Sequence, residues 1–304
     1  MAGTQARQPA LIPRFTGFAP GAGGYESIYL RAVDPQRPRG MWLRHTVHQA
    51  PGRPAVGSVW SVVYDPEPTA DKHSLPGPTS GDGAWLRVGE SAIGPDGVSG
   101  PHAELTWTVA DPEPLRHLPR ELLYSAPLPR TKSESPLPAI RLSGRVGALE
   151  LDDWPGMLGH NWGSEHAERW IWLHGIFADG WLDVVIGRVK VGPLVTPWIA
   201  NGAVSVGGAR TRFRGRAKVV EDPLGARVKA GALRVEVRSP ADRVVVWRYA
   251  DPVPGSEHHT ANGSIAELTA TLGGRTLRTP HGGVYELGMR ETGHGLPVLP
   301  FSDP

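Results

Sequence analysis

The segment from Gly159 to Gly175 holds the densest concentration of histidine and tryptophan in this 304-residue chain. It reads Gly-His-Asn-Trp-Gly-Ser-Glu-His from 159 and Arg-Trp-Ile-Trp-Leu-His-Gly from 169. Imidazoles transfer protons near neutral pH, and indole rings exclude water and stabilise cations. Together these residue types are typical of a pocket that holds a largely apolar molecule against a few polar groups.

Residues 169–177, which include the second part of this segment, alternate as a β-strand does. At strand spacing Trp170, Trp172 and His174 share one face, and the other face is aliphatic. Asp179-Gly180 predicts a two-residue hairpin turn, because a type I′ turn needs positive φ at both central positions.

The predicted turn pairs Ala178 with Trp181 and so sets the register. Trp181 and Asp183 then join the aromatic face, and Asp183 lies diagonal to His174, roughly 7 Å away. We expect this face to line a cavity in the second half of the chain, with the aliphatic face left for packing.

Asp183 is the preferred proton donor, on the hypothesis that the tryptophans keep its carboxyl group protonated. His174 is expected to orient it, and Glu26 is a second candidate acid. The residues expected to bind the ligand are His160, Trp162, His166, Trp170, Trp172 and Trp181. An alternative stays open: a buried His-Asp pair can serve structure alone.

No metal or organic cofactor is expected. The spacing of His160, His166 and His174 matches no closed zinc pattern, and the chain has no cysteine. Gly21-Ala22-Gly23-Gly24 precedes a predicted strand rather than a helix, which argues against a phosphate-binding loop.

Length and composition predict two domains, because a chain of this size exceeds what one core usually supports. We place the boundary after Leu158, giving domains 1–158 and 159–304. The 32 basic and 30 acidic residues are dispersed, which argues against nucleic acid as a partner. No signal peptide or membrane-spanning segment is evident, so a cytoplasmic protein is expected, with transient membrane contact left open.

Period-two alternation dominates, which predicts an all-β sandwich or barrel. Two stretches, 65–83 and 111–138, are rich in proline and turn residues and are expected to be irregular. The second is expected to hold a short helix near 119–124 and is a candidate strap across the other domain.

Gly159-His160-Asn161-Trp162-Gly163, followed by Trp170, Trp172 and His174, resembles the core motif of the carotenoid 1,2-hydratase (hydroxyneurosporene synthase) and AttH-like family. That family is related to tocopherol cyclase and to lipocalin-like Diels-Alderases. Residues 25–29 and 41–44 resemble its opening segment, and 283–286 match its closing strand more weakly. The resemblance implies two tandem lipocalin-like antiparallel β-barrels and a hydrophobic small-molecule substrate handled without a cofactor.

Two functions follow. The first is a cofactor-independent enzyme of the lyase or isomerase class that uses acid-assisted hydration, cyclisation or isomerisation of an isoprenoid or polyketide-like alkene. The second is a non-catalytic lipocalin-like carrier or sensor. A carboxyl group directed into a closed apolar cavity favours the enzyme.

Overall fold

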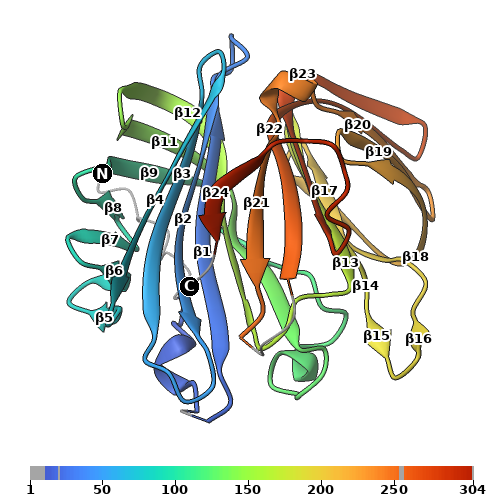
Figure 1. The fold of residues 1–304 in the computed structure, drawn as a ribbon. Coiled ribbons are helices and arrows are strands. Elements are labelled where there is room, and N and C mark those ends of the chain that lie inside the picture. Colours follow the sequence, from blue (N-terminus) through green and yellow to red (C-terminus); the bar gives the residue numbers. More distant parts are fainter. Residues whose placement is uncertain (1–10, 20, 253–256, 303–304) are drawn as a thin grey trace.

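The computed structural model describes residues 11–19, 21–252 and 257–302, and it is built almost entirely of strands (Figure 1). Strands account for 67% of the chain and helix for 3%, so the all-β prediction is confirmed. Within the described ranges, the helical segments are three short 3₁₀ turns: η1 (Phe15–Gly17), η2 (Glu121–Tyr124) and η3 (Ala241–Arg243). Among the described residues, no helix has the length and apolar character needed to cross a membrane.

The first sheet contains the twelve strands of residues 24–163. In order along the sheet, β4-β3-β2-β1-β12-β11-β9-β8-β7-β6-β5 are hydrogen-bonded neighbours, and β10 pairs with β11. Their bounds are β1 Gly24–Val33, β2 Gly40–Gln49, β3 Val56–Tyr64, β4 Pro68–Pro76, β5 Thr79–Gly81, β6 Ala84–Val88, β7 Ser91–Gly94, β8 Gly97–Ser99, β9 Ala103–Asp111, β10 Leu115–Arg116, β11 Thr131–Val146 and β12 Leu149–Gly163.

This sheet curls into a half-barrel without closing, and its edge strands β4 and β5 do not pair. Strand β6 instead packs across β2, β3 and β4. Alternate residues of β1, such as Ile28 and Leu30, point into the core enclosed by this curl, together with Leu43, Leu86 and Leu158.

The second sheet is formed by residues 169–302. Its strands are β13 Arg169–Phe177, β14 Gly180–Arg188, β17 Ile199–Val206, β18 Ala209–Asp222, β19 Gly225–Ala230, β20 Leu233–Arg238, β21 Val245–Ala250, β22 Glu257–Leu272, β23 Arg275–Met289 and β24 Val298–Ser302. Pairing of β20 with β22 closes eight of them into an antiparallel barrel, and β21 and β24 extend from β22. Strands β15 (Lys190–Val191) and β16 (Leu194–Val195) form a small separate hairpin.

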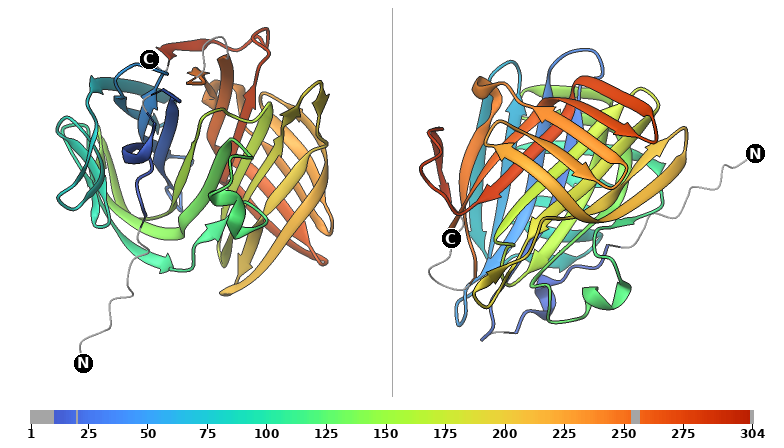
Figure 2. Two further views of the ribbon diagram at one scale, coloured as in Figure 1. Left: turned by 90° about the horizontal axis from the view of Figure 1, so that it is seen from below. Right: turned by 90° about the vertical axis from the view of Figure 1, so that its right-hand side faces the viewer.

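The two sheets lie side by side and share a buried aromatic interface (Figures 1 and 2). Trp42 and Trp60 on the outer side of the half-barrel meet Trp247 and Tyr249 of β21. The rings of Trp42 and Trp247 stack with centroids 4.8 Å apart. Strands β1 and β2 are therefore buried on both faces, one against the core of their own sheet and one against the neighbouring sheet. Their residues are buried almost without interruption, instead of alternating between buried and exposed.

Several sequence expectations are wrong in detail. The stretch 65–83, expected to be irregular, contains β4 and β5, and the stretch 111–138 contains β10 and the first half of β11. Asn-Gly often forms a hairpin turn, but Asn262-Gly263 lies inside the continuous strand β22, where the pairing with β23 shifts register after Gly263. The predicted domain boundary after Leu158 falls within β12, and the chain crosses from one sheet to the other over residues 164–168.

Candidate active site between the two sheets

The β13–β14 hairpin turns one residue earlier than predicted. Phe177 pairs with Gly180 across a turn at Ala178 and Asp179, and His174 lies directly opposite Asp183. Neither Asp179 nor Gly180 has positive φ. Gly180 is required for a different reason: a Cβ there would lie 1.9 Å from the carbonyl oxygen of Ser205 on β17.

The register moves by two residues in total, so the predicted sharing of faces is preserved, but the location of the cavity is not. The barrel interior is filled by the aliphatic face, including Ile171, Leu173 and Leu182. The face with Trp172 points out of the barrel and is buried against the first sheet. The expected cavity inside the second barrel is therefore replaced by one between the two sheets.

This inter-sheet pocket has a volume of about 310 Å³. Strands of both sheets line it, and the segment before β11 closes one side with Leu118, Pro119 and Leu123. The predicted strap is thus present: its 3₁₀ turn η2 lies close to the predicted 119–124, and Arg214 of the barrel donates to the Pro119 carbonyl at 3.1 Å. The aromatic wall consists of Tyr25, Tyr29, Trp42, Trp170, Trp172 and Tyr249.

Glu286 on β23 is a carboxyl group of this wall whose pKa is raised. Burial raises its pKa, and two hydrogen bonds oppose that rise only in part. Asn262 Nδ2 donates to Oε2 at 2.9 Å, and Trp170 Nε1 donates to Oε1 at 3.3 Å. The Asn262 amide is fixed in this orientation because its oxygen accepts from Ser264 and Tyr64. Glu286 is therefore a carboxyl group held in one orientation, with its pKa shifted in the direction that general acid catalysis requires.

His166 forms a second polar group on the pocket wall. Its backbone N–H and its ring Nδ1 both lie 2.7 Å from Asp251 Oδ1. The ring stacks on Tyr25 at 4.1 Å between centroids and is flanked by Trp170 and Tyr249 at 5.3 and 5.7 Å. The imidazole is thus held in one plane, with a buried carboxylate behind it.

His258 lies on the other side of Asp251, with Nδ1 3.9 Å from Oδ2. Burial lowers its pKa to about 3, so the imidazole is neutral. His166, Asp251 and His258 each offer one atom within 4.8 Å of the others, which is a composition able to hold a metal ion.

Arg44 places a positive charge at the same pocket. Its guanidinium lies over Tyr249 at 4.2 Å and over Trp60 at 4.8 Å from the ring centroids. Burial raises the pKa of Glu286, and the charge of Arg44 is among the groups that oppose this rise. The guanidinium also adds a third polar group to the aromatic wall.

Asp183 is sealed in the interface and does not line the pocket. Burial would raise its pKa, but His117 and Ser135 of the first sheet lower it to about 2. Trp172 Nε1 donates to Oδ1 at 3.0 Å, Ser135 donates to Oδ2, and His117 Nε2 lies 3.4 Å away. Because the carboxylate is ionised, the hypothesis that Asp183 is a protonated acid is not supported.

His174 is sealed as well. Arg31, reaching from β1, donates to its Nδ1 at 2.9 Å and also to the carbonyls of Gly282 and Ser264. Burial, and then the Arg31 charge, lower the pKa of His174 to about 3. The predicted orienting partner of Asp183 is thus a neutral group bound to an arginine.

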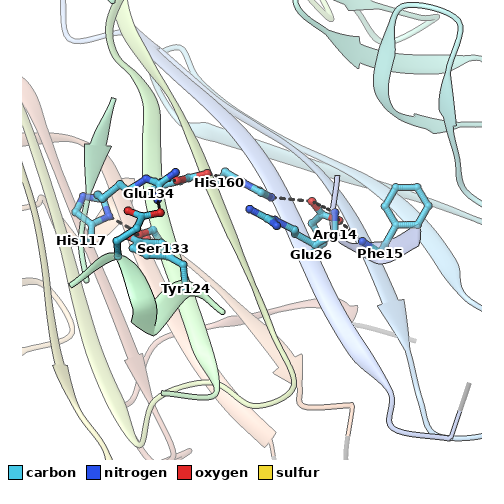
Figure 3. A network of polar contacts seen from close by, with 10 residues as sticks. Arg14, Phe15, Glu26, His117, Tyr124, Ser133, Glu134 and His160 are labelled. Atoms are coloured by element: carbon cyan, nitrogen blue, oxygen red, sulfur yellow. Dashed lines mark hydrogen bonds and ion pairs between the residues drawn. The ribbon is translucent and has the colours of Figure 1, made fainter. Parts of the chain in front are cut away.

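Glu26 and His160 belong to a network of polar contacts with Arg14, Phe15 and Glu134 (Figure 3). His160 stacks on Trp162, and its Nε2 lies 2.7 Å from Glu26 Oε1 while Nδ1 lies 3.3 Å from Glu134. Burial would lower its pKa, but the two carboxylates raise it. Glu26 also accepts the backbone N–H groups of Arg14 and Phe15. Of this set only Glu26 reaches the pocket wall.

Trp181 packs elsewhere, against Leu115 and Ala203, and donates to Asp111 at 3.2 Å. Of the predicted residues, the structure therefore gathers Glu26, His166, Trp170 and Trp172 at the pocket. Sequence reasoning missed three further residues: Glu286 lies on the pocket wall, Asn262 donates to Glu286, and Asp251 binds His166 from behind the wall. One signal was available: Glu286 is a lone carboxylate in the apolar strand Gly283-Val-Tyr-Glu-Leu-Gly-Met.

Comparison with known proteins supports the fold. No family model matches the chain. An uncharacterised protein of Mycobacterium tuberculosis, MT0513 in strain CDC 1551 and Rv0493c in strain H37Rv, is 27% identical over 308 residues, covering 93% of this chain and 91% of the relative. A crystal structure from Nitrosomonas europaea, provisionally described as AttH, matches with a TM-score of 0.54 at 15% identity, covering 96% of this chain and 100% of that one. The fold of this chain is therefore AttH-like.

Proposed function

We propose that this protein is a cofactor-independent enzyme that protonates an alkene bound in the inter-sheet pocket. The reaction class is hydration, cyclisation or isomerisation of an isoprenoid or polyketide-like substrate. The observation that carries the proposal is Glu286: a carboxyl group on an aromatic pocket wall, with its pKa raised by burial. Such a group donates a proton where a carboxylate cannot.

The aromatic wall supports the same chemistry. Proton transfer to an alkene leaves a carbocation, which the rings of Trp42, Trp170, Trp172 and three tyrosines stabilise through cation-π attraction. These rings also keep bulk water away from the cation. The pocket therefore favours an electron-rich apolar substrate.

Pocket size sets the extent of the substrate that is enclosed. A volume of about 310 Å³ lies at the lower end of the roughly 300–1,000 Å³ of small-molecule sites. A short isoprenoid fits entirely, whereas a carotenoid would insert only one end of its chain. Hydration at the end of a carotenoid, the activity implied by the sequence resemblance, is the finer form of this proposal.

Deuterium incorporation tests the proposal without a known substrate. The protein is incubated in D₂O with a panel of linear isoprenoid and polyketide-like alkenes, and products are measured by mass spectrometry. Wild type is expected to add one deuteron to carbon per turnover. Glu286→Gln keeps the shape but lacks the proton, so turnover should fall by about 10² to 10⁴.

Ligand binding, followed by quenching of tryptophan fluorescence, should persist in Glu286→Gln. Glu267→Gln, on an exposed site of β22, is the matched control and should behave as wild type. Binding of alkenes by wild type with no product and no deuterium on carbon would instead establish a carrier.

A further inference from the structure

We propose that His166 and Asp251 form a catalytic dyad in which His166 Nε2 is the general base opposite the acid Glu286. This inference rests on the function proposed above and narrows it to the addition or removal of water. It assigns a role to a carboxylate that lies 85 residues from its imidazole in sequence.

Asp251 fixes the tautomer of His166. Asp251, as a carboxylate, only accepts hydrogen bonds, and its Oδ1 lies 2.7 Å from the ring Nδ1. The ring hydrogen must therefore be on Nδ1, which leaves the lone pair on Nε2. The side chain of Asp251 is fully buried, whereas that of His166 retains 15% exposure and lines the pocket. This is the arrangement in which a buried carboxylate orients a general base.

Stacking between two tyrosines holds the His166 ring rigidly. The His166 ring is nearly parallel to Tyr25 and Tyr249, with interplanar angles of 12° and 10°. The backbone N–H of His166 is bound to the same carboxylate oxygen as its ring. The imidazole therefore cannot turn without breaking both its stacking and its hydrogen bond, so Nε2 keeps one direction.

Trp170 lies between the base and the acid. Trp170 contacts both groups: its ring stacks near His166 at 5.3 Å, and its Nε1 donates to Glu286 Oε1. One indole thus separates the two proton-transfer groups along the wall of one pocket. A substrate lying over Trp170 meets an acid at one end and a base at the other.

The reaction then balances as follows. The O–H bond of Glu286 breaks and its proton forms a C–H bond with one alkene carbon. Water attacks the cationic carbon, forming C–O, and its surplus proton moves to His166 Nε2. The imidazolium then returns that proton through pocket water to the Glu286 carboxylate. The net change is addition of H and OH across the double bond, and dehydration is the reverse.

A metal held by His166, Asp251 and His258 is the competing arrangement. Two ligands with bonds of about 2.0–2.2 Å to one ion lie roughly 3 Å or more apart. The observed 2.7 Å between His166 Nδ1 and Asp251 Oδ1 is a hydrogen-bond distance instead. The geometry favours a shared proton at this position.

The test compares His166→Gln, Asp251→Asn and the exposed-site control His102→Gln in the hydration assay. Turnover should fall by about 10² to 10⁴ in His166→Gln, while His102→Gln matches wild type. Asp251→Asn should lose at least about tenfold, because the neutral amide no longer fixes the tautomer. Circular dichroism and ligand quenching show whether each variant still folds and binds.

Chemical rescue separates catalysis from structure. His166→Ala leaves space between two tyrosines, and added imidazole should restore part of its turnover without changing its melting temperature. Wild-type turnover in His166→Gln would overturn the dyad while leaving Glu286 as the acid. Stoichiometric transition metal in wild type, lost with activity in Asp251→Asn, would replace the dyad with a metal site. No product from wild type would overturn both proposals.

Discussion

The outer face of β13 has two ends with different chemistry. At one end Trp170 lies on the pocket wall beside His166 and Glu286. At the other end His174 and Asp183 are fully buried and bound by groups of the first sheet. Both ends carry imidazole, carboxylate and indole, so residue type alone does not distinguish them.

The two ends differ in how fully the protein itself satisfies the polar groups of the carboxylates. Asp183 has three contacts, from Trp172, Ser135 and His117, and it is ionised. Glu286 accepts hydrogen bonds from two donors, and burial still raises its pKa. Polar groups at the sealed end hold the sheets together, whereas those at the open end retain capacity for a ligand. Substitutions should accordingly change stability at one end and turnover at the other.

Arg31→Met should cause the largest loss of stability. It leaves His174 Nδ1 and two backbone carbonyls without their donor inside a buried interface. Each orphaned acceptor is costly, and we expect the free energy of unfolding to fall by about 3–5 kcal/mol. Denaturation by urea measures it. Arg141→Met, at an exposed ion pair, should cost less than about 1 kcal/mol; an equal loss would show that Arg31 is not a special contact.

Asp183→Asn should cost about 2 kcal/mol near neutral pH and alter the acid dependence of stability. The folded pKa of about 2 lies below the ordinary 3.8, so this carboxylate stabilises the fold above pH 4. That contribution is lost as pH falls from about 4 to about 2. Unfolding measured across this range should show a shallower acid decline in Asp183→Asn than in wild type.

Turnover of Asp183→Asn also tests whether the role of Asp183 is structural or catalytic. Asp183 does not line the pocket, so a stably folded Asp183→Asn should keep turnover within about tenfold of wild type. A decrease of 10² or more at full folding would return Asp183 to the catalytic machinery, as the sequence analysis expected.

Glu286→Gln should have a smaller effect on stability, with the opposite dependence on pH. Burial raises the folded pKa of Glu286, so the fold loses stability as pH rises through that value. Glutamine does not ionise, and the variant should gain stability relative to wild type at alkaline pH. Melting temperatures measured from pH 5 to 9 test this; identical pH dependence in the two proteins would contradict a raised pKa.

Trp170→Phe should give the smallest effect. It removes the hydrogen bond to Glu286 Oε1 and keeps an aromatic ring in the wall. Since that bond lowers the pKa of Glu286, its loss should move the alkaline limb of the pH–rate profile to higher pH. A shift to lower pH would show that the indole does not act on Glu286.

Much of the local structure could be predicted from the sequence. Alternation over 169–177 identified β13 with its correct ends, and it separated Trp172 from Leu173 correctly. The turn at Asp179-Gly180 was misplaced because Gly180 is needed for close approach of β17, a contact with a later strand. The predicted faces were still correct after that error, since the pairing of β13 with β14 moved by two residues and side chains alternate with period two.

The residues that share a face of a strand could be predicted from the sequence, because strand geometry fixes the faces within a few residues. Which part of the protein packs against each face depends on the tertiary structure. Both faces of β13 are buried, one inside the barrel and one against the other sheet, so hydrophobicity could not identify the pocket side. Three contacts distinguish the proposed catalytic groups from the structural carboxylate Asp183. They join Glu286 to Asn262, Asp251 to His166 and Asp183 to Ser135. These partners lie 24 to 85 residues apart, and sequence periodicity carries no information at such separations.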